Sequence, residues 1–246
     1  MKTLQVFGHY SFRNSLILVL IQIAFSCSGH AQTASQKMRS DVVVEAYDDK
    51  GKPFAVSNRR NVEGSEMLNP DWGSGIVFFR NGRISPSMEI QLNLEKNELY
   101  FRRDEKTFMF TDSVSGFRVI YMDHDKLYNE IFRSGYPDHV GKKTTYFYQL
   151  LVDGKEIQLL LDRSKHLIDA YKYNEGEKSV YREDMYLYAY NVAKLEIVEI
   201  KNLKQAKSII ISIMPDREND INRICDEQKL TMKTREDVIK LVQGLQ

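Results

Sequence analysis

Alternation of apolar and polar residues between tight turns constrains the fold of this chain most strongly. Residues 88–94 show it best, because every second residue is apolar and those between are polar. Asn81-Gly82 and Asp153-Gly154 are strong two-residue hairpin signals. Because side chains alternate between the two faces of a strand, this pattern predicts an antiparallel β-meander with one buried face.

The predicted strands begin near Gly64 and end near residue 204. They cover residues 76–80, 88–94, 98–103, 106–111, 117–121, 145–152, 155–162, 167–173, 179–182, 185–190 and 195–200. Residues 122–143 are less regular, and we expect a linker or a long loop there. The region 64–204 is therefore either one β-rich domain or two meander halves, 64–121 and 144–204.

The C-terminal residues 205–246 have a different, helical period. One predicted helix ends before Pro215, Asp216 is expected to cap a second, and Thr234 begins a third with a capping-box-like sequence. Their apolar stripes have to be buried on the sheet or on one another. The predicted fold is mainly β (α+β): an antiparallel meander sheet or half-barrel with a C-terminal cap of two to three helices.

Residues 1–31 have the features of a secretory signal peptide. After a basic start, residues 16–25 form an apolar run, and small residues at Gly29 and Ala31 precede a cleavage site before Gln32. A ten-residue helix is only about 15 Å long, half of a hydrocarbon core. We therefore expect export to the periplasm, cell surface or exterior, with no transmembrane span in the mature chain.

Two further expectations concern the N-terminal region. Lipid attachment at Cys27 is the alternative to simple cleavage, although bulky Phe25 fits a bacterial lipobox poorly. Residues 32–63 are a predicted leader with one strand at 42–46. After cleavage Cys225 is the one remaining cysteine, and we expect it to be a small buried apolar residue.

Several segments resemble secreted β-rich proteins of unknown function that are common in Bacteroidota. The similarity lies in residues 64–72, in Gly75, Val77 and Gly82, in 94–101 and in 214–245. The resemblance implies an envelope or extracellular location and a β-rich domain. It implies no assigned activity, so no functional residues follow from it.

Charge and motif content exclude several classes of function. The chain has 35 Lys+Arg and 34 Asp+Glu, whereas a polybasic nucleic-acid binder needs a cationic excess. The sequence contains no phosphate-binding or dinucleotide-binding glycine motif and no nucleophile elbow. We therefore expect no nucleic-acid partner and no cofactor.

Enzymatic and metal sites have only weak candidates. Asp123, His124 and Asp125 are consecutive; they form either a polar turn or a weak cation site. A hydrolase with dispersed carboxylates is a further alternative, because acid–base pairs leave no sequence motif. Its candidates are Asp71, Asp112, Asp162 and Glu183.

Two aromatic groups are the candidate binding residues. Trp72 follows Asn69 and Asp71 in a predicted turn, where it either plugs the open end of the meander or is an exposed anchor. Tyr186 and Tyr188 are either a ladder that binds sugars or protein, or cross-strand packing on the buried face. The favoured interpretation is a non-enzymatic exported module that binds an unknown protein or envelope component.

Overall fold

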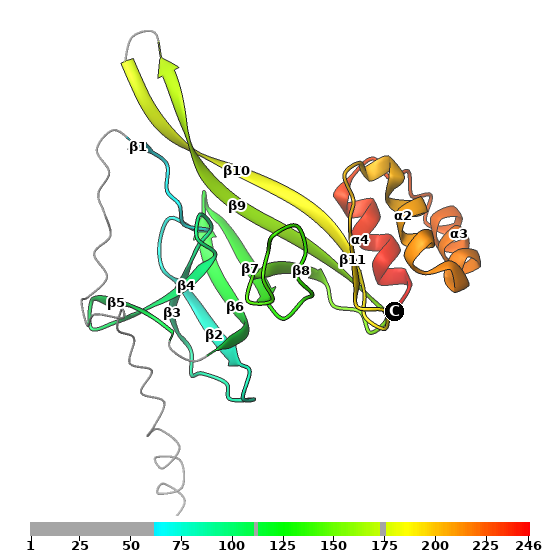
Figure 1. Cartoon of the computed structure of the whole chain (residues 1–246), viewed down its shortest axis with the longest axis horizontal. Helices are drawn as coiled ribbons and strands as arrows, with labels where there is room; N and C mark the ends of the chain where they lie inside the picture. Colours follow the sequence, from blue (N-terminus) through cyan, green and yellow to red (C-terminus); the bar gives the residue numbers. More distant parts are fainter. Residues whose placement is uncertain (1–61, 111–112, 173–175) are drawn as a thin grey trace, which may run out of the picture. The chain divides into compact units, whose positions relative to one another are not determined.

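The computed structural model describes residues 62–110, 113–172 and 176–246 (Figure 1). The signal-like segment, Cys27, the predicted strand at 42–46 and Asp112 lie outside these residues.

Among the described residues, eleven strands form a single sheet, in the order β1-β10-β9-β8-β7-β6-β2-β3-β4-β5 with β11 also paired to β10. The strands are β1 (Val62–Glu63), β2 (Gly73–Phe79), β3 (Met88–Asn93), β4 (Glu98–Arg103), β5 (Lys106–Met109), β6 (Val114–Asp123), β7 (Lys126–Arg133), β8 (Tyr148–Val152), β9 (Ile157–Lys172), β10 (Gly176–Asn191) and β11 (Glu196–Glu199). β1 runs parallel to β10, and the other pairs are antiparallel. The predicted mainly-β fold is confirmed.

The sheet curls into a half-barrel. Five other pairings separate β3 from β9 along the strand order, yet the main-chain nitrogen of Lys165 on β9 donates to the carbonyl oxygen of Leu94, just after β3, at 3.2 Å. The ammonium of Lys165 also donates to the carbonyl oxygens of Ser65 and Met67. These contacts bring the early strands back towards β9.

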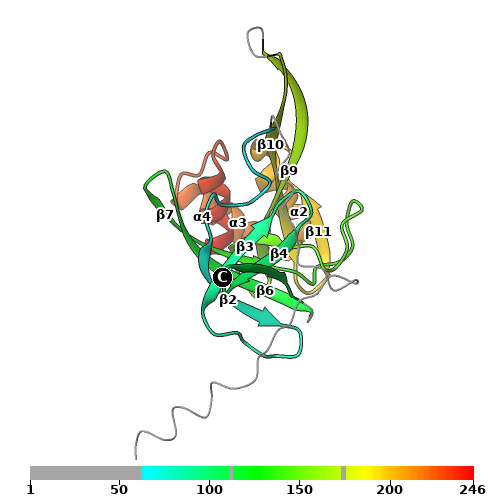
Figure 2. The same cartoon turned by 90° about the vertical axis from the view of Figure 1, so that its left-hand side faces the viewer.

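β9 and β10 are longer than the sequence pattern predicts. Each has 16 residues, and the two pair along their whole length, so the predicted breaks within each strand are wrong. The polar residues at the expected breaks pair across strands. The Nε of Arg163 donates to Oε1 of Glu183 at 2.6 Å, and its Nη1 lies 3.2 Å from Oε2 of Glu130 on β7. In Figures 1 and 2 the far end of this hairpin extends beyond the neighbouring strands.

The predicted linker at 122–143 contains a strand, β7, which corrects that expectation. Phe132 of β7 faces the interior, while Leu127 and Ile131 are apolar but exposed. Apolar residues therefore occur on both faces of β7, and the simple alternation that marks a strand in the sequence is lost. Residues 134–147, which connect β7 to β8, remain irregular.

Three helices follow the strands: α2 (Ala206–Ile213), α3 (Glu218–Glu227) and α4 (Arg235–Gly244). Their buried residues share one core with β9 and β10, in which Ile210, Ile221 and Leu241 pack with Leu159 and Leu187. The predicted helical cap on the sheet is thus confirmed. Figure 1 shows the three helices grouped at one end of β9 and β10.

The helix starts agree only partly with the sequence. The side chain of Thr234 accepts a hydrogen bond from the main-chain nitrogen of Asp237 at 3.1 Å, as the capping signal predicts. The expected cap at Asp216 is wrong, because Pro215–Arg217 form a 3₁₀ turn and α3 begins only at Glu218. Cys225 is buried among the helices, and burial raises the pKa of its thiol.

Candidate functional site

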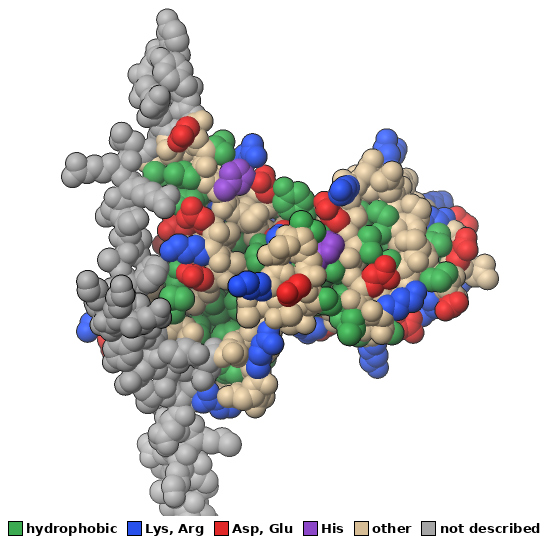
Figure 3. All heavy atoms as spheres, viewed as in Figure 1, with side chains coloured by type: hydrophobic (Ala, Val, Ile, Leu, Met, Phe, Trp, Pro, Cys, Tyr) green, Lys and Arg blue, Asp and Glu red, His purple; other side chains and the backbone are tan. Residues whose placement is uncertain are grey.

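Six large apolar side chains are exposed on three neighbouring strands in the middle of the sheet. We call them the apolar face: Ile76 and Phe78 on β2, Ile120 and Met122 on β6, and Leu127 and Ile131 on β7. Their exposed fractions range from 37% for Ile76 to 63% for Leu127. Figure 3 shows hydrophobic side chains reaching the surface over the strands as well as over the helices.

Strand register brings these residues together on one side of the sheet. Ile76 pairs with Arg118, which pairs with Ile131, and Met122 pairs with Leu127. Cross-strand partners point to the same face of a sheet, so these side chains are neighbours. The alternate residues of the same strands face inwards; Phe117 and Phe132 stack there with ring centroids 4.9 Å apart.

The apolar face contains one central cation. Arg118 is exposed between Ile76 and Ile131, and its Nε donates to Oδ1 of Asn129 at 2.7 Å. Apolar side chains around an arginine are typical of the core of a protein–protein interface. Contiguous exposed apolar surface in a soluble protein marks an interaction site more often than chance exposure does.

The apolar face is not among the residues that the sequence pattern identified. A signal is nevertheless present, because residues 76–79 and 119–122 are apolar at consecutive positions instead of alternating. Such runs predict a strand that is covered on both faces. Among the described residues only the inner face is covered here.

On β8–β10 the same outer face is covered by the connection 134–147. The register places Tyr148 beside Arg133, on the outer side, and Tyr148 packs edge-on against Tyr136 and Tyr188 at centroid distances of 5.6 and 5.8 Å. Tyr136 also contacts Tyr190 at 5.0 Å. This tyrosine cluster shows how the outer face is covered where a further chain segment crosses it.

The two predicted tyrosines lie in different environments. Tyr188 is 3% exposed within the tyrosine cluster, whereas Tyr186, two residues earlier on β10, is 43% exposed. Burial raises the pKa of Tyr148 to about 12 and also raises that of Tyr188. The clustered hydroxyls are therefore protonated at neutral pH and are poor candidates for bases.

A buried ion pair underlies the tyrosine cluster. Asp162 is 0% exposed, and its carboxylate contacts the ammonium of Lys142 and accepts a hydrogen bond from the hydroxyl of Tyr146 at 2.6 Å. Burial lowers the pKa of Lys142 to about 8, while the charge of Glu199 and the contact with Asp162 favour the charged ammonium. The pair attaches the 134–147 connection to β9.

Asn69, Asp71 and Trp72 are brought together just before β2. Asn69 is 1% exposed, and its side-chain amide donates to the carbonyl oxygen of Asp71. Trp72 is half-buried, with the guanidinium carbon of Arg102 5.6 Å from its ring centroid. Trp72 is thus neither the fully buried plug nor the fully exposed anchor that the sequence allowed.

The weak metal candidates form the tight turn between β6 and β7. His124 and Asp125 both have positive φ, and Asp123 pairs with Lys126 across the turn. The Nδ1 of His124 lies 2.9 Å from Oδ1 of Asp123, and the imidazole is 95% exposed. In the part of the chain that the structure describes, no group of three or more His, Cys, Asp or Glu side chains is placed to hold a metal ion.

Asp112 lies outside the described residues, and the other three carboxylates of the hydrolase alternative are not assembled into one site. Asp71 is exposed before β2, and the carboxylate of Glu183 is bound by Arg163. Asp162 pairs with Tyr186 and Glu183 with Lys165, which places the two carboxylates on opposite faces of the sheet. Both carboxylates contact a cationic side chain.

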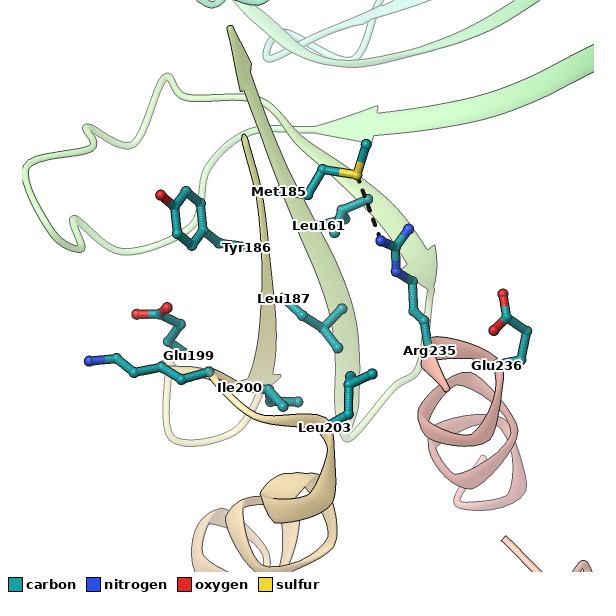
Figure 4. A pocket seen from close by; sticks show the side chains of 10 residues that line it. Leu161, Met185, Tyr186, Leu187, Glu199, Ile200, Leu203, Arg235 and Glu236 are labelled. Carbon is teal, nitrogen blue, oxygen red and sulfur yellow. Dashed lines mark hydrogen bonds between the residues drawn. The ribbon is translucent and has the colours of Figure 1, made fainter. Parts of the chain in front are cut away.

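A pocket of about 860 Å³ lies where β10 faces the end of β11 and the start of α4 (Figure 4). Its lining is apolar at Leu161, Met185, Leu187, Ile200 and Leu203, and polar or charged at Tyr186, Glu199, Lys201, Arg235 and Glu236. Tyr186 is thus the predicted site residue that lines this pocket.

The chain matches no protein-family model, no curated protein and no solved structure in the comparisons made. Within residues 62–110, 113–172 and 176–246, no helix is long and apolar enough to cross a membrane.

Proposed function

We propose that this chain is an exported, non-enzymatic module that binds a partner protein through the apolar face of β2, β6 and β7. The observation that supports binding is the exposure of six large apolar side chains around Arg118 on three paired strands. A partner that covers them removes apolar surface from water, at about 25 cal/mol per Å². The signal-like residues 1–31 and the resemblance to secreted Bacteroidota proteins support export.

A protein is preferred to a lipid surface because of the distribution of polar groups. Arg118 and Asn129 are hydrogen-bonded to each other in the middle of the apolar face. Insertion of this face into a bilayer would remove water from both side chains, which is unfavourable. A protein partner can instead supply a carboxylate or carbonyl acceptor to the remaining guanidinium donors. We therefore expect an acidic or polar side chain at the centre of the partner's surface.

Photo-crosslinking in the producing cell tests this proposal. A photoreactive side chain replaces Leu127 on the apolar face or, as the matched control, Leu195 in the turn between β10 and β11; both residues are 63% exposed. A discrete protein adduct at Leu127 that is absent at Leu195 is the expected result. Equal adducts at both positions would contradict the proposal, and a lipid adduct at Leu127 would favour an envelope lipid as the ligand.

A further inference from the structure

One edge of β10 is unpaired over its central part. β1 pairs with Ser179 and Val180 towards one end, and β11 pairs with residues 188–191 at the other. In the described ranges 62–110, 113–172 and 176–246, no strand pairs with β10 between these two positions on that side. We call residues 182–186 the open edge, because Gly64 lies beside Tyr181 and the carbonyl oxygen of Leu187 is bonded to Ile200.

Alternate residues of the open edge direct their main-chain N–H and C=O groups away from β9. The main-chain nitrogen of Ile200 donates to the carbonyl oxygen of Leu187 at 2.7 Å, so that carbonyl points away from β9. Main-chain direction alternates along a strand, which places the N–H and C=O groups of Met185 and Glu183 on the same outward side. Outward-directed strand groups of this kind are a template for the addition of another strand.

The 860 Å³ pocket runs along this open edge. Leu187 and Met185 project from one face of β10 and Tyr186 from the other, yet all three line the same pocket. Residues on opposite faces of a strand share a pocket only at the strand's edge. In Figure 4 the side chain of Tyr186 points to the opposite side of the strand from that of Leu187.

The two sides of the pocket differ in chemistry. On the Leu187 side, Leu161 and Ile200 form an apolar floor, and the Nη2 of Arg235 contacts the sulfur of Met185 at 3.7 Å. No ion pair joins Arg235 to an acidic side chain in the described part of the chain. On the side of Tyr186, Glu199 (Figure 4) is accompanied by Lys142, whose ammonium lies 6.0 Å from the centroid of the Tyr186 ring.

We propose that the open edge of β10 is a second binding site, which takes up an extended segment of a partner protein by strand addition. The side chains of an added strand alternate between the two faces. Those on the Leu187 side are apolar or acidic, to match the apolar floor and Arg235; those on the Tyr186 side are polar and uncharged, because Glu199 and Lys142 place both signs of charge there. This site is built from β10, β11 and α4, so it is independent of the apolar face.

A labelled synthetic peptide, Val-Thr-Leu-Thr-Asp, carries this alternation, has the length of the open edge and is titrated against the full mature chain by fluorescence anisotropy. In a control peptide, Val-Thr-Leu-Thr-Lys, the acidic residue expected to face Arg235 is replaced by a basic one, and we expect it to bind at least about tenfold more weakly. No binding of the first peptide at millimolar concentration, or equal binding of both, would overturn the proposal.

N-methylation separates strand addition from other modes of binding. One peptide variant is methylated on the Leu and Asp main-chain nitrogens and the other on the two Thr main-chain nitrogens. Because only alternate N–H groups of an added strand face β10, exactly one variant should lose binding. Loss or retention of binding in both variants would contradict strand addition, whatever the side-chain preference.

Variants of the protein locate the site. Arg235→Glu should weaken binding of the first peptide by about tenfold, Arg235→Lys should weaken it less, and Lys240→Glu, exposed on the same helix, should leave it unchanged. Equal losses of peptide affinity in Arg235→Glu and Lys240→Glu would overturn the assignment of the site.

Slow hydrogen exchange at the Glu183 and Met185 amides in the free monomer would also overturn it, because it would show that the edge is already paired. Protection that appears only in a dimer would instead assign the edge to a second copy.

Discussion

The ammonium of Lys142 contacts the carboxylate of Asp162, a side chain that is completely buried. The two residues are 20 positions apart, one on the connection between β7 and β8 and the other on β9. A charge at that depth is tolerated only with a partner, so this contact fixes the connection over the tyrosine cluster.

Removing the Lys142 ammonium alone should therefore destabilise the folded protein. Lys142→Met leaves the Asp162 carboxylate without its cation, and we expect the free energy of unfolding to fall by about 3–5 kcal/mol, as measured by urea denaturation. The double variant Lys142→Met/Asp162→Leu should recover most of this loss, because no unpaired charge remains. Lys143→Met, at an exposed neighbouring position, is the control, and an equal effect of the two single variants would contradict the account.

Close packing between β2, β3 and β6 predicts that a larger residue at Gly75 will destabilise the fold. A methyl group at Gly75 would overlap the side chain of Ile90 and lie 2.8 Å from the carbonyl oxygen of Arg118. We expect Gly75→Ala to lower the free energy of unfolding by about 1–3 kcal/mol, through overpacking. Ser74→Ala, on the exposed side of the same strand, should change it by less than about 1 kcal/mol. The prediction is wrong if Gly75→Ala melts at the wild-type temperature.

The helical cap should contribute to the stability of the sheet. Leu241 of α4 is 0% exposed in the core that α2, α3 and α4 share with β9 and β10. Leu241→Ala should lower the free energy of unfolding by about 2–5 kcal/mol, because apolar burial is lost and a cavity remains. Lys240→Ala, exposed next to it, should have little effect. If Leu241→Ala leaves the chemical denaturation midpoint unchanged, the cap is not part of the cooperative unit.

The intact mass of the exported protein tests the signal-peptide prediction. Cleavage after Ala31 gives a chain that begins at Gln32, because small residues at Gly29 and Ala31 fit the cleavage site. A lipid-modified chain that begins at Cys27 would contradict this expectation and support the lipid-anchored alternative.

Much of the fold follows from local pattern. The Asn81-Gly82 and Asp153-Gly154 pairs lie in connections between antiparallel strands, though not as two-residue turns, and the helical stripes are buried. The alternation in β3 predicts the strand but not its burial, because Gln91 and Asn93 are buried as well. The long strands β9 and β10 were missed because Arg163 and its neighbours are polar, and only a tertiary partner such as Glu130 shows why a strand continues there.

The candidate sites depend on contacts that local pattern does not contain. The apolar face combines β2 with β6 and β7, and Ile76 becomes a neighbour of Ile131 only through strand register. The open edge of β10 depends on where β1 and β11 end their pairing. Of the residues proposed from sequence, Tyr186 lines the edge pocket, while Trp72 lies before β2 beneath Arg102.

The central claim is that the apolar face binds a protein, and one measurement tests it most directly. The yield of the protein adduct formed by the photoreactive side chain at Leu127 is compared in chains with and without Ile120→Glu. Ile120 is 38% exposed on β6, so a carboxylate there should leave the melting temperature nearly unchanged while it charges the binding surface. We predict that the adduct falls to the background level of the Leu195 control. An undiminished adduct in a folded Ile120→Glu chain would contradict the claim.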